Sequence, residues 1–241
     1  MHLLALKAAT EARDTNHATP LLATLRCLRD GLLSADAAVE VVAALLAHGA
    51  RAAATYPQGF NAGESAYHTL FSLPTAARCS GGEAATPALL RLLLRADRQQ
   101  GGPGSASGSA ACRMPLEGVR AVAVRGGFTP LHVACRGGPG EAYVEREVGA
   151  ALQEAVLALC AAGADPNAVA VEPVGTGGRV VERRPLDTLV CRLLDAPVAV
   201  AGWPYTGVRE WADCAAALVS CGANARVCCE ETRVWLRKAG V

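Results

Sequence analysis

The chain has 241 residues, of which 23 are basic and 22 acidic, so its formal net charge is only +1. This balance excludes the broad positive field that would hold nucleic acid or an anionic membrane surface. Hydrophobic residues make up 51% of the chain but aromatic residues only 4%, a mixture of Ala, Leu and Val that favours closely packed helices. No apolar run approaches the roughly 18 residues needed to cross a bilayer.

The N-terminal residues lack the long apolar core of a secretory signal peptide. The ten cysteines therefore point to reduced thiols, most of them in apolar helical patterns where cysteine acts as a small hydrophobe. We expect an intracellular, cytoplasmic protein without membrane insertion.

Helical patterns begin early in the chain. Residues 2–13 predict a short helix, and Thr19-Pro20-Leu21-Leu22 opens a second one, because threonine caps a helix start and proline suits its first residue. Residues 36–47 predict an amphipathic helix. Gly49 follows it, where a left-handed residue ends many helices.

The same order returns in weaker form. A loop at residues 56–61 offers two candidate partner contacts, Tyr56 and Phe60. Ser65-Ala66-Tyr67-His68 then opens a helix, and a second helix from Thr86 is expected to end at residues 95–97 without a glycine. Residues 99–111, QQGGPGSASGSAA, have the composition of a flexible polar linker.

The clearest signal lies at residues 127–169. Thr129-Pro130-Leu131-His132 opens a helix, and a second amphipathic run ends at Gly163. Asp165, Pro166 and Asn167 then favour a turn. The sequence predicts a helix pair followed by a turn.

The remaining chain repeats this order. Arg184-Pro185-Leu186-Asp187 opens a helix, and the break at residues 202–205 offers Trp203 and Tyr205 as further candidate contacts. An amphipathic helix from Val208 ends at Gly222, and Asn224 follows. Residues 230–240 predict a short C-terminal helix.

The Thr-Pro-Leu-His and Gly-Ala-Asp-x-Asn elements, in this order around an amphipathic helix, resemble an ankyrin repeat. The resemblance implies an all-α, ankyrin-type helical-repeat solenoid of about four divergent helix–turn–helix units with long inserted loops. It assigns structural roles to one set of residues: Thr129, Pro130, Leu131, His132, Gly163, Asp165, Asn167, Gly49, Gly222 and Asn224.

We expect a capping helix at residues 1–18, a repeat domain at 19–227 and a second capping helix at 228–241. The units span about 19–64, 65–97, 127–169 and 184–227, with a flexible insertion at 98–126. An ordinary ankyrin period is about 33 residues, and the spacing here is longer. The sequence therefore predicts longer helices, expanded helix–helix loops, or both.

The sequence offers little chemistry, so we expect no catalytic residues, metal or cofactor. His132 lies near Cys135, a combination that suggests a cysteine–histidine nucleophile, but the Ala-rich surroundings of Cys135 and Cys160 favour buried core thiols. There is no Cys-x-x-Cys pair for zinc. The Gly-rich segments at 101–104 and 137–140 lack the Lys-Ser/Thr of a phosphate-binding loop.

The resemblance therefore implies a non-enzymatic protein-binding module, or a scaffold subunit of a larger assembly, that holds other proteins through its repeat surface and inserted loops. One alternative is a substrate adaptor of a ubiquitin ligase, although the 14 residues after Val227 are few for the additional box such adaptors carry. The other is a cysteine-dependent enzyme, which would need a strongly acidic thiol. The candidate loop aromatics could equally fold back and fill gaps in the solenoid.

Overall fold

The computed structural model describes residues 9–72, 85–100, 116–123, 126–136, 146–174, 179–195 and 208–241. This part of the chain is mostly helical, as the sequence predicts, with one small antiparallel hairpin that an all-α description omits. The larger helices and the strands are α2 (Pro20–Arg29), α3 (Ala35–Ala47), α4 (Ala66–Phe71), α6 (Ala85–Gln100), α8 (Pro130–Arg136), α9 (Arg146–Ala161), β1 (Ala170–Val174), β2 (Arg179–Arg183), α10 (Pro185–Asp195), α11 (Val208–Ser220) and α12 (Glu230–Ala239).

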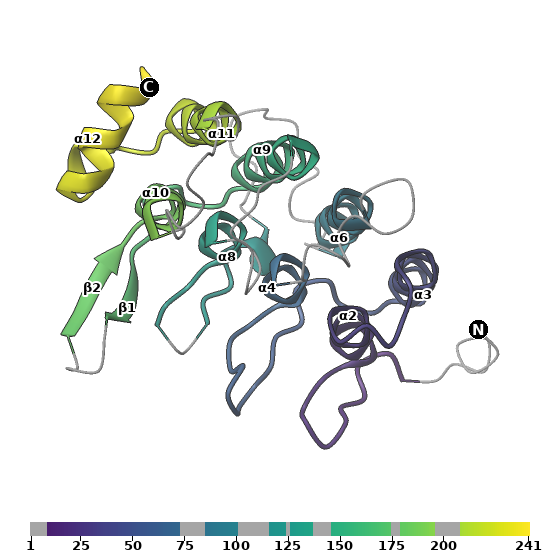
Figure 1. Ribbon diagram of the computed structural model, residues 1–241. Helices are drawn as coiled ribbons and strands as arrows, with labels where there is room; N and C mark the ends of the chain where they lie inside the picture. The colour runs from purple at the N-terminus through teal and green to yellow at the C-terminus, as the bar shows by residue number, and fades with distance from the viewer. Residues whose placement is uncertain are drawn as a thin grey trace, which may run out of the picture.

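The helices lie in two rows (Figure 1). One row contains α2, α4, α8 and α10, and each packs against the next; we call these the inner helices. The other row contains α3, α6, α9 and α11, also in sequential contact, and α12 packs against both α10 and α11 at the C-terminal end. Each inner helix is followed in the chain by a helix of the second row.

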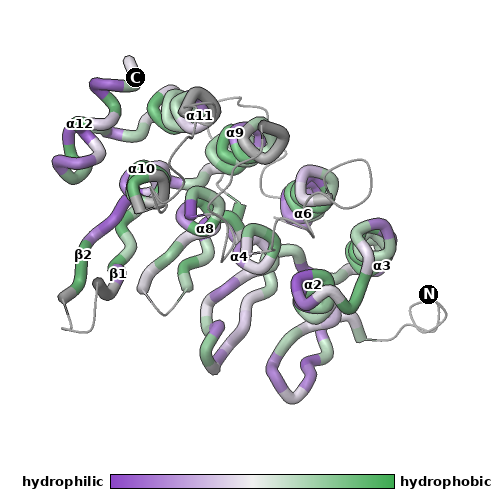
Figure 2. The backbone as a smooth tube through the Cα atoms, in the orientation of Figure 1, coloured by the Kyte–Doolittle hydropathy of each residue, from purple (hydrophilic) through white to green (hydrophobic). Residues whose placement is uncertain are grey.

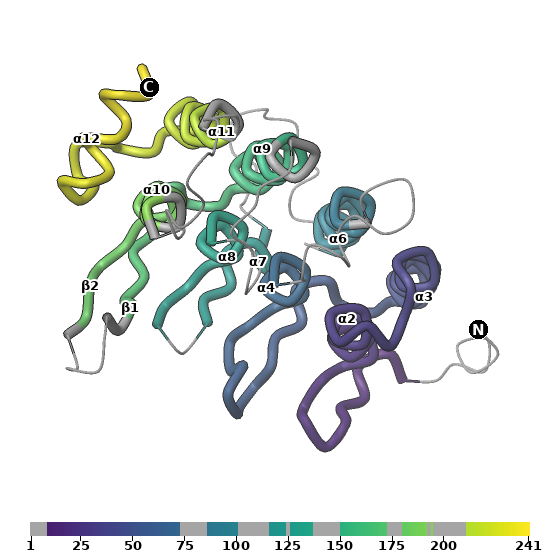
Figure 3. Tube along the Cα trace, in the orientation of Figure 1, coloured from purple at the N-terminus to yellow at the C-terminus, as the bar shows by residue number. Residues whose placement is uncertain are grey.

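A hairpin-like loop, which we call a finger, precedes each inner helix and projects away from both rows (Figures 1 and 3). Backbone hydrogen bonds close each finger at its base: Asp14 to Ala18 in finger 1, Tyr56 to Glu64 in finger 2, Ala123 to Phe128 in finger 3, and the β1–β2 ladder in finger 4. In every case the last residue of the finger directly precedes the N-cap of the inner helix.

Three helices of the second row end in the same way. Gly49, Gly163 and Gly222 have φ angles of +90°, +95° and +97°, in the left-handed region. The residue after each glycine donates its N–H to a carbonyl five residues back, as Ala164 does to Leu159 O at 3.0 Å. Glycine is favoured there because it has no Cβ to clash.

The core lies between the rows and continues from one helix pair to the next. Leu21, Tyr67, Leu131 and Leu186 occupy the same place, two residues after the N-cap, in the four inner helices, and each is completely buried. Figure 2 shows apolar segments along the helices, whereas finger 1 is strongly polar. Because no pair encloses its own apolar surface, burial depends on its neighbours.

The structure differs from the sequence prediction near the N-terminus. Residues 9–18 form finger 1 and contain no helix, so the part of the expected capping helix that lies among the described residues is absent. Asp14 accounts for this, because its carboxylate accepts the backbone N–H groups of Asn16 and Ala18 at 2.8 Å each. Such local side-chain bonds compete with a helix.

A second difference concerns the expected end of the second unit at residues 95–97. These residues lie inside α6, which continues to Gln100. A short helix, α7 (Glu117–Arg120), and finger 3 occupy the described C-terminal part of the insertion expected at 98–126. Residues 30–34 join α2 and α3, whereas residues 73–84, 137–145 and 196–207, which follow the other inner helices in the chain, lie outside the described residues.

The left-handed glycines provide a direct test of helix termination. A Cβ added at Gly222 would meet no atom within 4 Å, so Gly222→Ala introduces backbone strain without a clash. We expect the free energy of unfolding to fall by about 1 kcal/mol, measured by urea denaturation. Gly222→Asn should lose less, because asparagine tolerates this conformation; equal losses for both variants would contradict the explanation.

Candidate functional site

The turn that opens each inner helix carries most of the polar side chains that the sequence singled out. In α8, His132 Nδ1 accepts the backbone N–H of Thr129 at 3.2 Å and lies 2.8 Å from the Thr129 hydroxyl oxygen. Pro130 occupies the first helical position, and Leu131 points into the core. In α4, Ser65 and His68 form the same turn, with the Ser65 N–H donating to His68 Nδ1 at 3.0 Å.

The histidines also connect one inner helix to the turn before the next. Because Nδ1 accepts a backbone N–H, the ring proton is assigned to Nε2. His68 Nε2 then donates to the carbonyl of Phe128 at 2.9 Å, and His132 Nε2 donates to the carbonyl of Arg183 at 3.2 Å. Each carbonyl belongs to the last residue of a finger, so one side chain fixes the helix turn, the next finger and the spacing between them.

Burial keeps these histidines neutral. His68 is only 2% exposed, and desolvation lowers its pKa to about 4, against the favourable effect of the Phe128 carbonyl. Desolvation likewise lowers the pKa of His132. Both ring nitrogens of each histidine are engaged in hydrogen bonds within the fold. This arrangement suits a structural link and leaves neither histidine placed to exchange protons with a substrate.

The fourth inner helix uses an aspartate at the same place. Asp187 Oδ2 accepts the Arg184 N–H at 3.2 Å, and its Oδ1 accepts the Cys229 N–H at 2.9 Å. Cys229 is the N-cap of α12, which presents a donor where α4 and α8 each meet a carbonyl. An acceptor-only carboxylate therefore fits this position as histidine fits the others.

Amide side chains join the segments that follow the left-handed glycines. Asn167 donates from Nδ2 to Gly222 O at 2.9 Å and accepts the Asn224 N–H at 2.7 Å. The equivalent position after Gly49 is Ala53, and there Gln100 of α6 supplies the clamp: its Nε2 donates to Ala50 O at 2.7 Å, and its Oε1 accepts the Ala52 N–H at 3.0 Å. The Gln100 contact was missed because its partners lie about 50 residues away in the chain.

The two remaining members of the predicted set form local turns. Asp165 Oδ1 accepts the Asn167 N–H at 2.8 Å, and Asn224 Oδ1 accepts the Arg226 N–H at 3.0 Å. Such bonds stabilise a turn and leave Asn167 oriented toward the following segment.

A buried contact around Gly118 also escaped sequence reasoning. The Tyr67 hydroxyl and the Gly118 N–H both donate to Asp97 Oδ2, at 3.1 and 3.2 Å. Burial raises the pKa of Asp97 in spite of these bonds. A Cβ at Gly118 would lie 2.6 Å from a Tyr67 ring carbon, so glycine permits α7 to approach α4. Nothing local to Gly118 indicates this, because its partners come from α4 and α6.

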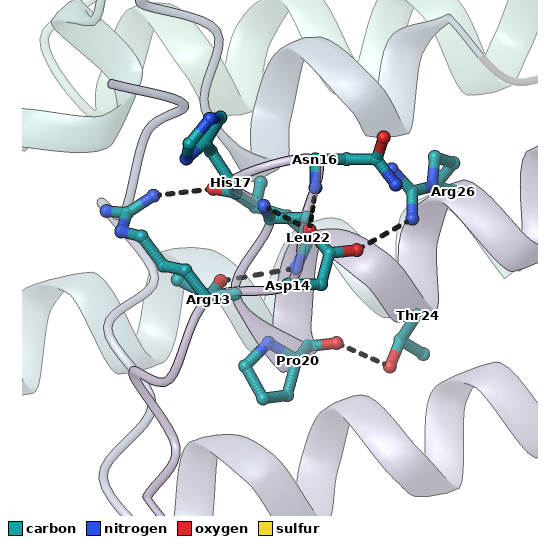
Figure 4. Close-up of polar contacts among 10 residues, drawn as sticks. Arg13, Asp14, Asn16, His17, Pro20, Leu22, Thr24 and Arg26 are labelled. Carbon is teal, nitrogen blue, oxygen red and sulfur yellow. Dashed lines mark hydrogen bonds and ion pairs between the residues drawn. The ribbon is translucent and has the colours of Figure 1, made fainter. Parts of the chain in front are cut away.

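Finger 1 is organised by Asp14 and Arg13 (Figure 4). The Asp14 carboxylate also pairs with Arg26 of α2 at 3.0 Å, and the bond from the Ala18 N–H is the main cause that lowers its pKa. Arg13 donates to the carbonyl of His17 at 2.8 Å, as Figure 4 shows, and to the carbonyl of Thr55 in finger 2 at 3.0 Å. Fingers 1 and 2 are thus joined side by side.

Cys135 and Cys160, the cysteines considered as nucleophiles from the sequence, are poorly suited to form thiolates. Cys135 is completely buried, and desolvation raises its pKa well above the usual value. Desolvation also raises the pKa of Cys160 to about 12. Nucleophilic thiols require the opposite shift. Within the described ranges, no three His, Cys, Asp or Glu side chains come close enough to hold a metal ion.

The candidate aromatic contacts separate into different environments. Tyr56 is only 3% exposed and belongs to the hydrophobic core, so it is a packing residue and its prediction as a partner contact is corrected. Phe60, at the end of finger 2, is 76% exposed. Trp203 and Tyr205 lie outside the described residues.

A shallow cleft of about 440 Å³ lies between finger 2 and α7. Its lining consists of Ala53, Thr55, Glu117, Arg120 and Ala121. Glu117 pairs with Arg51 at 3.5 Å, but both side chains are well exposed and such a pair contributes little. The lining contains neither a thiol nor a histidine, and it fits contact with a partner's side chain better than chemistry on a substrate.

Stacked helix pairs, joined by buried side-chain hydrogen bonds and extended by fingers, define a helical protein whose units share one continuous core. The family model described as Ankyrin repeat matches residues 126–170. Residues 126–170 therefore contain an ankyrin repeat, as the sequence indicates. A search of curated proteins finds no match to the chain. None of the helices in the described ranges has the length and apolar character required to span a membrane.

The buried histidines predict a pH-dependent stability. The folded-state pKa of His68 lies below the value of 6.5 expected when it is exposed, so the unfolded chain binds the proton first as the pH falls. Stability from this residue is complete above about pH 6.5 and is lost toward pH 4. Between pH 7 and pH 5 we expect a loss of roughly 2 kcal/mol from His68.

Urea denaturation at a series of pH values measures this dependence. His68→Leu should flatten it, since leucine occupies the equivalent place in α2 as Leu22. Replacement of the exposed His48 by leucine provides the matched control and should preserve the slope. A His68→Leu variant with an unchanged slope would show that other groups determine the dependence.

Proposed function

We propose that this protein is a non-enzymatic protein–protein interaction module, or a scaffold subunit of a larger assembly, built as an ankyrin-type solenoid of four units. The observation that carries the proposal is that the polar side chains at the opening turns are buried inside the stack, whereas the fingers project from it. Titratable side chains at the opening turns, such as His68 and His132, are buried and occupied in linking neighbours. The fingers, in contrast, project from the stack (Figure 1), and residues 11–16 of finger 1 and 57–60 of finger 2 are exposed. A surface of this kind suits recognition of another protein.

The four units begin at the equivalent N-cap residues Thr19, Ser65, Thr129 and Arg184. In support of this division, each of these residues stands between a finger and an inner helix. The left-handed glycines Gly49, Gly163 and Gly222 support ends for the first, third and fourth units. The second unit has no such glycine, and we propose that it extends past residue 97 to include the whole of α6.

The partner is proposed to contact the finger tips and the inserted sequence that carries Trp203 and Tyr205. Phe60 is the best described anchor, because a large exposed aromatic side chain on a projecting loop is a frequent source of binding energy. Trp203 and Tyr205 stay proposed contacts on the basis of their sequence. A cytoplasmic location likewise remains a proposal.

The role of Phe60 can be tested by affinity purification from the native source followed by mass spectrometry. Phe60→Ala should reduce capture of specific partners by about tenfold or more, as expected when an interface anchor is removed. Leu32→Ala is a matched control, because Leu32 is also 76% exposed but lies between α2 and α3, away from the fingers. Capture that is lost equally in both variants, or in neither, would contradict the proposed contact.

The cysteine-dependent enzyme is disfavoured by the direction of the thiol pKa values. Burial raises the pKa of Cys191 to about 11 and that of Cys228 to about 12. We therefore expect slow alkylation of Cys135, Cys160, Cys191 and Cys228 by iodoacetamide in the native protein near neutral pH, measured by mass spectrometry. All ten cysteines should react once the chain is unfolded in urea. One cysteine that reacts far faster in the native protein than in urea would revive the enzyme hypothesis.

A further inference from the structure

Four cysteines lie where the α8–α9 helix pair meets α11. Helices α9 and α11 are neighbours in the second row (Figure 1), and the cysteines come from α8, α9, α11 and the residue that follows α11. Cys135 and Cys214 are buried, whereas Cys160 and Cys221 are partly exposed. A small reagent in solution therefore reaches the second two thiols more easily than the first two.

Cys160 and Cys221 are brought together at the C-terminal ends of the two helices. Cys160 lies in the last turn of α9, and Cys221 directly follows α11. Just beyond them, Asn167 donates to Gly222 O at 2.9 Å and so joins the segments that follow the two helices. Ala217, one turn before Cys221, is a small buried residue on the same side of α11. The two thiols lie within hydrogen-bonding reach of each other.

Both thiols are free in the structure, and their surroundings give them different reactivity. Desolvation, and next the adjacent Cys221 sulfur, raise the pKa of Cys160 to about 12. Because the thiolate is the nucleophile, Cys160 is poorly suited to attack a reagent that arrives from solution. It is well placed, however, to attack a sulfur atom that is already beside it.

We propose that Cys160 and Cys221 are a redox modification site, at which hydrogen peroxide forms a reversible disulfide between α9 and the end of α11. The Cys221 sulfur attacks one peroxide oxygen, the O–O bond breaks, and a sulfenic acid and water are formed. The Cys160 sulfur then attacks the Cys221 sulfur, and the sulfenic oxygen leaves as water. In total the two thiols lose two electrons and two protons, and one peroxide becomes two water molecules.

The disulfide would act as a covalent brace between neighbouring helix pairs. Stacked pairs depend on each other for burial of their apolar surface, and such units can open locally. A bond between Cys160 and Cys221 closes a loop that contains finger 4, α10 and α11, and this restricts the unfolded chain. A thiol reductant restores the free pair. This inference concerns the fold itself and does not depend on the proposed protein-binding function.

Peptide mapping of the full chain tests the bond directly. The protein is treated with hydrogen peroxide, remaining thiols are blocked with iodoacetamide in urea, and the digest is examined by mass spectrometry. We expect a peptide in which Cys160 is joined to Cys221 and which dithiothreitol separates. Thermal unfolding followed by circular dichroism should show a Tm about 5 °C or more higher after oxidation, and dithiothreitol should reverse the rise.

Serine variants identify the order of the two steps. Cys221→Ser should abolish both the linked peptide and the rise in Tm. Cys160→Ser should also abolish them, but it should leave a sulfenic acid on Cys221 that dimedone traps. Cys27→Ser is the matched control, because Cys27 is also partly exposed but lies in α2, at the other end of the stack. This variant should behave as the original protein does.

Three results would overturn the proposal. One is that Cys160 and Cys221 both stay free after peroxide treatment, or that Cys221 is oxidised to a sulfinic acid beside a free Cys160. Another is that either cysteine is linked to a different one. The third is a linked peptide without a rise in Tm, which would reject the brace. Each of these is measured on the original protein, so the test holds even where a serine variant does not fold.

Discussion

The buried hydrogen bonds made three residues after the N-cap by the side chains in α4, α8 and α10 are the constraint on which this fold depends. His68 and His132 each accept from their own turn and donate to the last residue of the following finger. One such bond contributes only about 1 kcal/mol net, but an unpaired polar group at the same buried place would cost more. The network therefore fixes how neighbouring helix pairs and fingers are spaced.

Because the same turn holds both a helix and the base of a finger, the finger tips can differ without disturbing the stack. Finger 1 is closed between residues 14 and 18, whereas finger 4 includes the whole β1–β2 ladder. The change from histidine to Asp187 follows from the same geometry, since α12 offers an N–H in place of a carbonyl. At the C-terminal end of the stack, Asp187 takes the place of histidine and binds the N-terminus of α12. Among the described residues no finger directly precedes α12, so the row of fingers ends with the β1–β2 hairpin.

Sequence reasoning succeeded where a residue's role is set by its neighbours in the chain. Thr129 and Pro130 open a helix and Gly163 ends one because capping and left-handed φ are local properties. It failed where a distant contact decided the outcome. Tyr56 looked like an exposed loop aromatic, yet it is buried in the core, and the expected end at Ala96 lies inside α6.

The sequence by itself determined the ankyrin repeat at residues 126–170, the mostly helical class and the turns around His132 and Gly163, since these depend on short-range spacing and backbone sterics. Only the tertiary structure decided that residues 9–18 form a finger, that Gln100 clamps Ala50 and Ala52, and that β2 forms an outer edge. The Gln100 clamp joins segments about 50 residues apart, finger 1 is also held by the bond from Arg13 to Thr55 O, and the outer edge of β2 results from the absence of a following finger among the described residues. Such contacts depend on how the units stack, which the pattern within one unit does not encode.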